Sequence, residues 1–476
     1  MIKYKLFRDF VKRYTEKDLS GARREEKIDK STGVKDKTTM KKEINIIGAG
    51  LAGSEAALFL ARRGWKVRLY EMRPGKQTPA HETGLAAELV CSNSLKSLRL
   101  DTASGLLKAE MEMLGCALLP LAGECMVPAG QALAVDRLMF ATRVQQALEA
   151  EESIELIREE VKALPDELTI LATGPLTSES MMEALSGIIG SEHLYFFDAI
   201  APVVEAQSLD LNKIYSKDRY DKGDPDYLNC PFDKDEYYSF VNALIEGEKH
   251  EAHEFESKFF ENVRFSFYEN CMPVEEIARR GIDSLRHGVM KPMGLESPVT
   301  GRKPFAVLQL RAENLERTSY NLVGCQTMLR YPEQKRIFRL VPGLEQAEFH
   351  RFGSIHRNTY LNSPALLNPD LSLRGNPKVY VAGQLSGVEG YVESIGIATL
   401  LGHILDSGLP MLPEETILGQ LWRHLITPSE QSFQPMNANF GILPPLENAP
   451  RDKKLKKEMY SQRSLDALSQ MSRLTY

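Results

Sequence analysis

Cysteine is the residue type in this chain with the widest range of possible chemistry. Its six cysteines are Cys91, Cys116, Cys125, Cys230, Cys271 and Cys325. None forms a CxxC pair, and the spacing of the closest two fits neither a zinc finger nor a redox motif. In a reducing compartment we expect thiols, with no disulfide and no metal site. For Cys91, in "LVCSNSLKS", two interpretations remain: a small buried side chain or a reactive thiol.

A glycine-rich motif lies about forty positions before Cys91. The segment "GAGLAG" places Gly48, Gly50 and Gly53 in GxGxxG spacing. Such glycines permit a tight turn, close approach of the backbone to a pyrophosphate, and close packing of helix on strand. The remaining positions of the motif are Ala49, Leu51 and Ala52. The N-terminus of the following helix offers free N–H groups to phosphates.

The elements around this motif predict a βαβ unit. "INII" is a short apolar strand, "SEAALFLARRG" is rich in helix formers, and "KVRLYE" is a second strand that ends at Glu71. An acid 23 positions after Gly48 can accept a hydrogen bond from a ribose hydroxyl, with Arg73 just beyond it. Because an acid there disfavours a 2′-phosphate, we expect FAD or NAD rather than NADP. The alternative, an ordinary glycine-rich turn, leaves the flanking strands and Glu71 unexplained.

A second stretch far downstream has a similar pattern of strand, glycine-rich turn and helix. "PKVYVAGQLSGVEGYVESIGIATLLGHIL" predicts a strand, a glycine-rich turn and a helix from about Glu393. "LTILATGP" (168–175) predicts another buried strand. Cofactor binding by two separated segments suits a long cofactor such as FAD, although the late glycines could also be turn glycines. The predicted contacts here are Gly383, Gln384, Gly390, Glu393 and Ser394.

The alternation of strands and helices predicts an α/β fold, in which a two-part Rossmann-like FAD-binding domain is interrupted by a smaller α+β insertion domain. Residues 1–42 carry 14 Lys/Arg against 7 Asp/Glu, with few large apolar residues, and we expect a flexible basic extension. The first FAD-binding part covers 43–199 and the insertion covers 200–344. The second FAD-binding part, with a C-terminal helical tail, covers 345–476.

Composition narrows the class of protein. The chain has 476 residues, is 43% hydrophobic, and contains neither an apolar run of about 18 residues nor a secretory signal, so we expect a cytoplasmic protein that binds no membrane. The net charge of −6 leaves nucleic-acid binding to local basic patches. Such patches occur near Lys291 and in the tail, at Lys453, Lys454, Lys456 and Lys457. A solvated helix face explains the tail equally well.

Several longer motifs support a family resemblance from about residue 43 to the C-terminus. They are "IGAGLAGSEAA", "YEMRP", "ELVCSNSLKS", "YLNCP", "ENCMPVEEIARRG", "GRKPFAVLQLR", "HRNTYLNSP", "AGQLSGVEGYVES" and "NANFGILPP". Together they resemble the bacterial folate- and FAD-dependent tRNA (uracil-5-)-methyltransferases. The N-terminal extension departs from that family pattern.

The resemblance implies formation of 5-methyluridine at position 54 in the T-loop of tRNA. Methylenetetrahydrofolate would donate the carbon, and FAD reduced by NAD(P)H would supply electrons. The expected partners are therefore the T-arm of tRNA, methylenetetrahydrofolate and NAD(P)H. The oligomeric state is not indicated by the sequence.

The family uses two thiols, and the matching positions are Cys91 and Cys271. We assign Cys271 as the nucleophile on uracil carbon-6 and Cys91 as the flavin-side thiol that removes the carbon-5 proton. His356, Arg357 and Asn358 are candidates for contacts with the folate pterin or flavin, and Lys291 for phosphates or folate carboxylates. A core histidine and surface ion pairs are the respective alternatives.

Other functions stay open at this stage. An NAD(P)H-dependent flavin oxidoreductase acting on a small molecule would share the cofactor motifs. So would the related FAD-dependent modification of wobble uridine, although the pattern around the two cysteines does not match it. A flavin-bearing RNA-binding module without catalysis is the third possibility.

Overall fold

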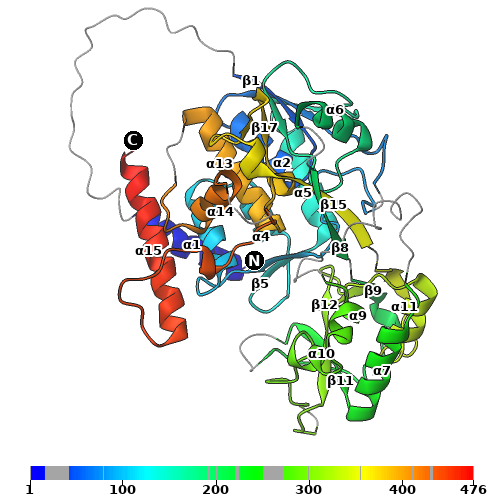
Figure 1. Ribbon diagram of the computed structural model, residues 1–476. Helices are drawn as coiled ribbons and strands as arrows, with labels where there is room; N and C mark the ends of the chain where they lie inside the picture. The colour runs from blue at the N-terminus through cyan, green and yellow to red at the C-terminus, as the bar shows by residue number, and fades with distance from the viewer. Residues whose placement is uncertain are drawn as a thin grey trace, which may run out of the picture.

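The computed structural model describes residues 2–16, 42–78, 80–189, 193–199, 201–219, 225–249, 272–298, 300–353, 355–408, 412–428 and 433–474. These residues form a larger α/β body and a smaller α+β body joined by a narrow connection (Figure 1). Each body has its own cluster of buried apolar side chains.

The larger body is organised around a six-stranded sheet with the order β16-β17-β7-β1-β2-β6. The strands from β17 to β6 run parallel, and only β16 is antiparallel to its neighbour. Their bounds are β1 Glu43–Ile47, β2 Lys66–Tyr70, β6 Ile154–Ile157, β7 Thr169–Leu171, β16 Ser372–Leu373 and β17 Asn376–Val381. Strands from both ends of the chain thus share one sheet, as a two-part α/β unit requires.

Two apolar helices form the centre of this body. Every residue of α2 (Leu51–Ala61) is buried, and α13 (Tyr391–Ser407) packs against it. A helix that is hydrophobic on all sides is stable only when covered on all sides. Gly402 makes the contact possible, since a Cβ there would lie 2.4 Å from the Phe59 ring. Further helices of this body are α3 Ala103–Met113, α4 Leu118–Glu124, α5 Arg137–Glu149, α6 Glu179–Ile189, α12 Ser363–Leu366 and α14 Ile417–Ile426.

The smaller body contains an antiparallel sheet with the order β10-β11-β12-β13-β9-β14. The strands are β9 Val203–Glu205, β10 Tyr215–Ser216, β11 Tyr227–Phe232, β12 Ala306–Ala312, β13 Ser319–Leu322 and β14 Phe349–Arg351. The helices are α7 Lys234–Glu246, α9 Val274–Arg279, α10 Ser284–His287 and α11 Tyr331–Phe338. Because β14 still belongs to this sheet, the smaller body extends a few residues past the predicted boundary at 344.

A two-stranded antiparallel ribbon connects the bodies. It pairs β8 (His193–Ala199) with β15 (Ile355–Leu361), in a register that sets His356 opposite Asp198. The chain leaves the larger body along β8 and returns along β15 (Figure 1). A small sheet with the order β3-β5-β4 completes the larger body, with bounds β3 Ser94–Ser97, β4 Met126–Val127 and β5 Ala132–Val135. Three 3₁₀ turns are η1 Ala206–Ser208, η4 Gly383–Ser386 and η5 Phe440–Ile442.

The prediction of a flexible extension is wrong for its first part. Residues Ile2–Glu16 form helix α1, which packs against α3 and the C-terminal helix α15 (Lys453–Leu474). Tyr4, Phe7 and Val11 recur on one helix face and are buried in the core of the larger body. The i, i+3, i+7 spacing of these three residues is typical of an amphipathic helix, but the many charged residues around them favoured the prediction of an extension. Residues 17–41 lie outside the described part of the chain.

No helix among the described residues is long and apolar enough to cross a membrane.

Candidate functional site

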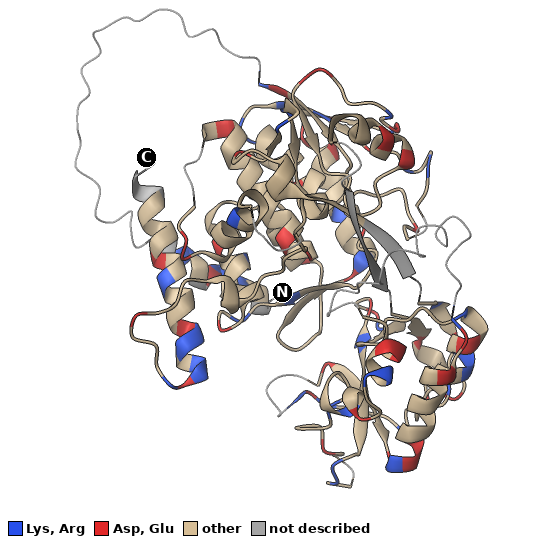
Figure 2. Ribbon diagram, in the orientation of Figure 1, with Lys and Arg blue, Asp and Glu red and all other residues tan. Residues whose placement is uncertain are grey.

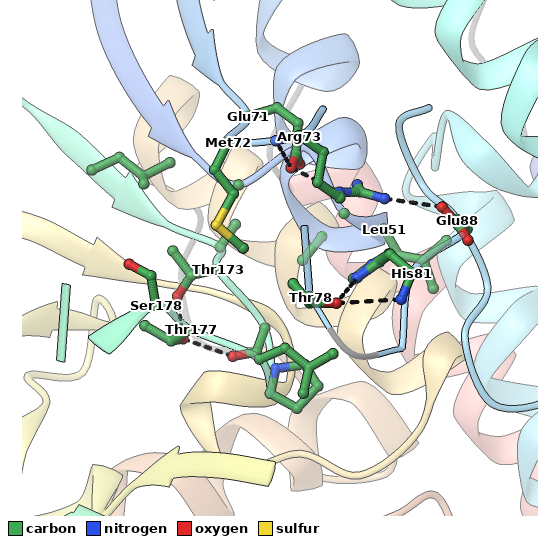
Figure 3. A pocket seen from close by; sticks show the side chains of 18 of the residues that line it. Leu51, Glu71, Met72, Arg73, Thr78, His81, Glu88, Thr173, Thr177 and Ser178 are labelled. Atoms are coloured by element: carbon green, nitrogen blue, oxygen red, sulfur yellow. Dashed lines mark hydrogen bonds and ion pairs between the residues drawn. The ribbon is translucent and has the colours of Figure 1, made fainter. Parts of the chain in front are cut away.

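The main cavity lies where the parallel strands of the larger sheet end. Its wall is formed by residues that follow β1, β2 and β7, with side chains from η4 and the start of α13 (Figure 3). It encloses about 1260 Å³, its open mouth included. Ligands of open α/β sheets bind at this edge, because the loops there converge and helix N-termini point towards it.

The glycine turn between β1 and α2 has the geometry of a phosphate cradle. Gly48 has a φ of +99°, and a Cβ there would lie 2.6 Å from the Ala172 carbonyl oxygen. A Cβ on Gly53 would lie 1.8 Å from the carbonyl oxygen of Gly48. Around Gly50, by contrast, a Cβ would meet nothing within 4 Å, because this residue faces the cavity. The turn therefore needs two glycines for packing and exposes the third to a ligand.

Glu71 fixes the turn from the end of β2. Its carboxylate accepts hydrogen bonds from the Ala49 N–H (3.0 Å) and from Nε of Arg73 (2.9 Å). Arg73 is itself buried and pairs with Glu88 at 3.1 Å. Burial would raise the pKa of Glu71, but the Arg73 guanidinium and the backbone donors outweigh burial and hold the pKa below its usual value. Glu71 thus remains a charged acceptor on the cavity wall.

Cys91 lines this same cavity, together with Gln384, Tyr391 and Ser394. It is a half-buried thiol, and its backbone N–H donates to the Tyr391 hydroxyl at 2.7 Å. The structure therefore brings together one predicted catalytic thiol with eight predicted cofactor-binding residues, six from the first segment and two from the late segment. The lining members of those sets are Gly48, Gly50, Leu51, Ala52, Glu71, Arg73, Gln384 and Ser394.

The segment that carries the thiol, here called the thiol loop (residues 89–93), is held by arginines from distant parts of the chain. Arg137 on α5 donates to the carbonyl oxygens of Leu89 (2.6 Å) and Cys91 (3.0 Å), and pairs with Glu313 at 2.5 Å. Arg351 at the end of β14 approaches the Cys91 carbonyl at 3.4 Å. Burial opposes both charges of the Arg137–Glu313 pair, but their attraction raises the pKa of Arg137 and lowers the pKa of Glu313. The pair therefore stays ionised.

Asn93 ties the thiol loop directly to the smaller body. Its side chain is fully buried, donates to the carbonyl oxygens of Val135 (3.1 Å) and Ala312 (3.0 Å), and accepts from Nε of Arg311 at 2.8 Å. Since Ala312 and Arg311 belong to β12, the thiol is positioned jointly by both bodies.

Other predicted residues lie behind the cavity wall. Gly383 packs on Ala52, where a Cβ would approach to 2.7 Å. Glu393 is fully buried; its carboxylate pairs with Lys96 at 2.8 Å and accepts from the Ala438 N–H at 3.0 Å. These contacts bind the start of α13, which follows Gly390, to the strand after the thiol loop and to the C-terminal "NANFGILPP" motif. Their role is to shape the wall.

The remaining predicted residues belong to the smaller body or the connecting ribbon. Cys271 lies outside the described residues; the chain resumes at Met272, which is buried. His356, Arg357 and Asn358 lie on β15, but their side chains are also outside the described part. Lys291 is exposed on the smaller body, away from the residues that line the cavity.

Sequence reasoning missed the loop that follows β2 and the one that follows β7. Thr78 contacts His81 at 2.6 Å, and the hydroxyls of Thr173 and Thr177 lie 2.6 Å apart on the opposite wall (Figure 3). Their position in the sequence could have identified them, because polar residues directly after a parallel strand lie at the edge of the sheet where ligands bind. Tyr391 was missed although it directly follows a predicted glycine.

The comparisons with known proteins identify the family of this chain. The family described as "Glucose inhibited division protein A" matches residues 43–408. The methylenetetrahydrofolate–tRNA-(uracil-5-)-methyltransferase TrmFO of Moorella thermoacetica is 51% identical over 433 residues, which cover 90% of this chain and 98% of that protein. The chain belongs to the TrmFO family. The TrmFO of Bacillus subtilis is 47% identical over 435 residues, with 90% and 98% covered.

Solved structures support the fold of this TrmFO family member. Aquifex aeolicus GidA in its form II crystal has a TM-score of 0.65 at 14% identity, over 91% of this chain and 73% of that one. Its form I crystal gives 0.60 at 14% identity, over 90% and 78%. At this identity the likeness establishes the α/β architecture alone. The resemblance read from the sequence motifs is confirmed by the sequence comparisons.

Proposed function

We propose that this chain methylates carbon-5 of the T-loop uridine of tRNA, with methylenetetrahydrofolate as the carbon donor and NAD(P)H-reduced FAD as the reductant. The observation that carries the proposal is the shared wall of the cavity, where a dinucleotide cradle and the Cys91 thiol meet. Membership of the TrmFO family supports the choice of substrate and donor.

The residues of the cavity fit FAD. Gly50 leaves room for a pyrophosphate at the N-terminus of α2, and the charged Glu71 can accept from ribose hydroxyls. Gln384 on η4 and Ser394 at the start of α13 line the same cavity and would border the flavin end. Reduced FAD, when bound, supplies the hydride that turns the transferred carbon into a methyl group. The chain's own task is to hold the pyrimidine beside that ring and to exclude water.

In this proposal the two cysteines act at different steps of the reaction. The Cys271 thiolate adds to carbon-6 of uracil and makes carbon-5 nucleophilic, which a thiolate does better than a hydroxyl near neutral pH. After carbon-5 has bonded to the methylene group of the folate, Cys91 removes the carbon-5 proton, and tetrahydrofolate leaves as the exocyclic methylene forms on the pyrimidine. Its place on the cavity wall, beside the Tyr391 hydroxyl, supports this assignment. Release of Cys271 from carbon-6 completes the turnover.

The proposal is tested by incubating unmodified tRNA with the protein, methylenetetrahydrofolate and NADH or NADPH, and mapping the methylated uridine. The purified protein should be yellow and should bleach on addition of NAD(P)H under nitrogen. With T-arm RNA that contains 5-fluorouracil, a covalent adduct should form, and Cys271→Ala should abolish it. Absence of both methylation and adduct would overturn the proposal.

The alternatives give different outcomes in the same assay. A small-molecule flavin oxidoreductase would bleach without an RNA adduct. A wobble-uridine enzyme would modify the anticodon instead of the T-loop. A passive RNA-binding flavoprotein would bind tRNA and leave it unmodified.

A further inference from the structure

The start of α15 carries the densest cluster of exposed basic residues in the C-terminal part of the chain (Figure 2). We define this basic ridge as Arg451, Lys453, Lys454, Lys456 and Lys457. Asp452 and Glu458 are its acidic neighbours, so the ridge keeps a local excess of three positive charges. Four of its five basic residues are exposed, and Lys456 is half-buried near the Tyr460 ring.

Folding does not explain this arrangement. The first turns of a helix favour acidic residues, because the helix dipole places partial positive charge at the N-terminus. Helix α15 begins at Lys453 and has no acidic residue in its first turn; its acidic cap is Asp452 directly before it, whose carboxylate accepts from the Leu455 N–H at 2.7 Å. The lysines that follow add positive charge at this end of the helix, and within the ridge only Lys454 has a carboxylate four residues ahead, with Glu458 at 3.6 Å. Lys456 contacts the Tyr460 ring, whereas Lys453 and Lys457 are exposed, and this excess of exposed positive charge points to a ligand.

The rest of α15 is firmly seated, which gives the ridge a fixed position. Leu465 and Leu468 are buried, and the Ser464 hydroxyl donates to Glu110 of α3 at 2.6 Å. The N-terminal helix α1, with Tyr4 buried, contacts both α3 and α15. The lysines therefore project from a held helix and not from a free tail.

The ridge is also connected to the thiol loop by a short piece of chain. The Ser461 hydroxyl donates to the Leu100 carbonyl oxygen, and Leu100 follows β3, the strand directly after the thiol loop. Nine residues separate Leu100 from Cys91, which limits their distance to about 30 Å. From Ser461 back to Lys453 the helix adds about 12 Å. An RNA whose uridine reaches Cys91 can span this distance with its backbone.

We propose that the basic ridge binds the phosphate backbone of the substrate RNA while its uridine occupies the cavity. This inference rests on the proposed function and adds to it a second contact region outside the cavity. The chemistry is that of charge: lysine ammonium groups bind phosphates without reading sequence and release condensed counterions on binding. Because the whole chain has a net charge of −6, such contacts must come from a local cluster.

The test compares two triple variants of the full-length holoprotein. The ridge variant is Lys453→Ser/Lys454→Ser/Lys457→Ser, and the control is Lys213→Ser/Lys234→Ser/Lys335→Ser, which removes two exposed lysines and one half-buried lysine from the smaller body. Binding of an unmodified tRNA transcript is measured by fluorescence anisotropy between 50 and 300 mM KCl. Each lost phosphate contact lowers the slope of log K against log salt by about 0.7–0.9.

The ridge variant should lose about two to three units of that slope and bind tRNA at least about tenfold more weakly at low salt. In the methylation assay its KM for tRNA should rise while kcat stays near the wild-type value. Its melting temperature should be unchanged or higher, because the removed lysines oppose the helix dipole. The control should keep the wild-type slope.

An unchanged slope in the ridge variant, or an equal loss in both variants, would overturn the inference. A second result would also overturn it. If the wild-type protein binds phosphatidylserine-containing vesicles through the ridge, and the ridge variant still binds tRNA normally, the ridge belongs to a membrane surface. If the wild-type protein binds tRNA but methylates no uridine, the proposed function fails, and the slope comparison still decides the role of the ridge.

Discussion

The glycine turn and the thiol loop line one cavity but are held in different ways. The turn between β1 and α2 is held mainly by residues within about 40 positions of it, such as Glu71 and Ala87, and it packs on Ala172 directly after the adjacent strand β7. The thiol loop is held by Arg137, Glu313, Arg351 and Tyr391, which come from both bodies. The shape of the glycine turn is thus set mainly by nearby residues, whereas the position of the thiol depends on the docking of the two bodies.

The largest effect is expected from breaking the turn itself. In Gly53→Ala the new Cβ would meet the Gly48 carbonyl oxygen at 1.8 Å, and backbone cannot yield there as a flexible side chain can. We expect a stability loss of about 3 kcal/mol or more and almost no bound FAD. Flavin absorbance per protein and thermal unfolding measure both.

Gly50→Ala is the matched control for that variant. Its Cβ meets nothing within 4 Å, so the protein should fold with an unchanged melting temperature in the absence of cofactor. The methyl group would still intrude on the ligand, so FAD affinity should fall. Normal flavin content in Gly53→Ala would show that the turn is not the cofactor site.

The second largest effect is expected from Cys91→Ala, which distinguishes the role of the thiol from that of the glycine turn. Cys91→Ala removes the proposed base without touching the glycine turn, and a lost general base costs about 10²–10⁴-fold in rate. FAD content and its reduction by NAD(P)H should remain at the wild-type level. Methyl transfer is measured on unmodified tRNA under saturating cosubstrates. Retention of wild-type turnover would assign Cys91 to packing.

A smaller loss of activity is expected from Arg137→Lys, which tests whether docking of the two bodies positions the Cys91 thiol. Arg137→Lys keeps the charge but cannot contact the Leu89 carbonyl, the Cys91 carbonyl and Glu313 together, because an ammonium lacks the planar fork of a guanidinium. We expect kcat to fall about 10- to 100-fold with FAD content unchanged, since small misplacements of reacting groups are costly. The rate of Cys91 alkylation by iodoacetamide should change in parallel.

Arg143→Lys on the same helix provides the control for Arg137. Arg143 is half-buried and pairs with Glu124 at 2.7 Å, away from the thiol loop, so its replacement should leave both kcat and the alkylation rate unaltered. Equal behaviour of the two variants would mean that the thiol loop is set locally, as the glycine turn is.

The smallest effect on methyl transfer is expected from replacing Lys108, which contacts the end of the strand that follows the thiol loop and whose main influence is on stability. Its ammonium is buried and donates to the carbonyl oxygens of Ser97 (2.8 Å) and Ser104 (2.9 Å). Burial lowers the pKa of Lys108 to about 7, against 10.5 for an ordinary lysine. Between these values the unfolded chain binds the extra proton, so the contribution of Lys108 to stability rises with pH from about 7 to 10.

Lys108→Met should remove that pH dependence. The difference in unfolding free energy between wild type and variant should shift in favour of wild type by roughly 3 kcal/mol between pH 6.5 and 9.5. Urea unfolding at the two pH values measures it, and methyl transfer per folded molecule should change little. A constant difference would show that Lys108 titrates normally.

The elements that could be predicted were those with a local signal. The strands β1, β2, β7 and β17 and the helices after the two glycine segments fall where apolar runs and glycine spacing indicated them. Helix α1 was missed because three apolar residues among many charges form a weak pattern until a partner surface buries them. Glu393 was expected at the cofactor, yet it pairs with Lys96 behind the wall, a contact between residues nearly 300 positions apart.

The sequence by itself determined the dinucleotide motif, the βαβ unit around it and the family, because these depend on residue types at short, fixed spacing. Only the tertiary structure decided that Cys91 reaches the same cavity as the glycine turn and that both bodies hold its loop. The physical reason is that hydrogen bonds and ion pairs between distant segments form only once the separate cores have packed and brought their surfaces together.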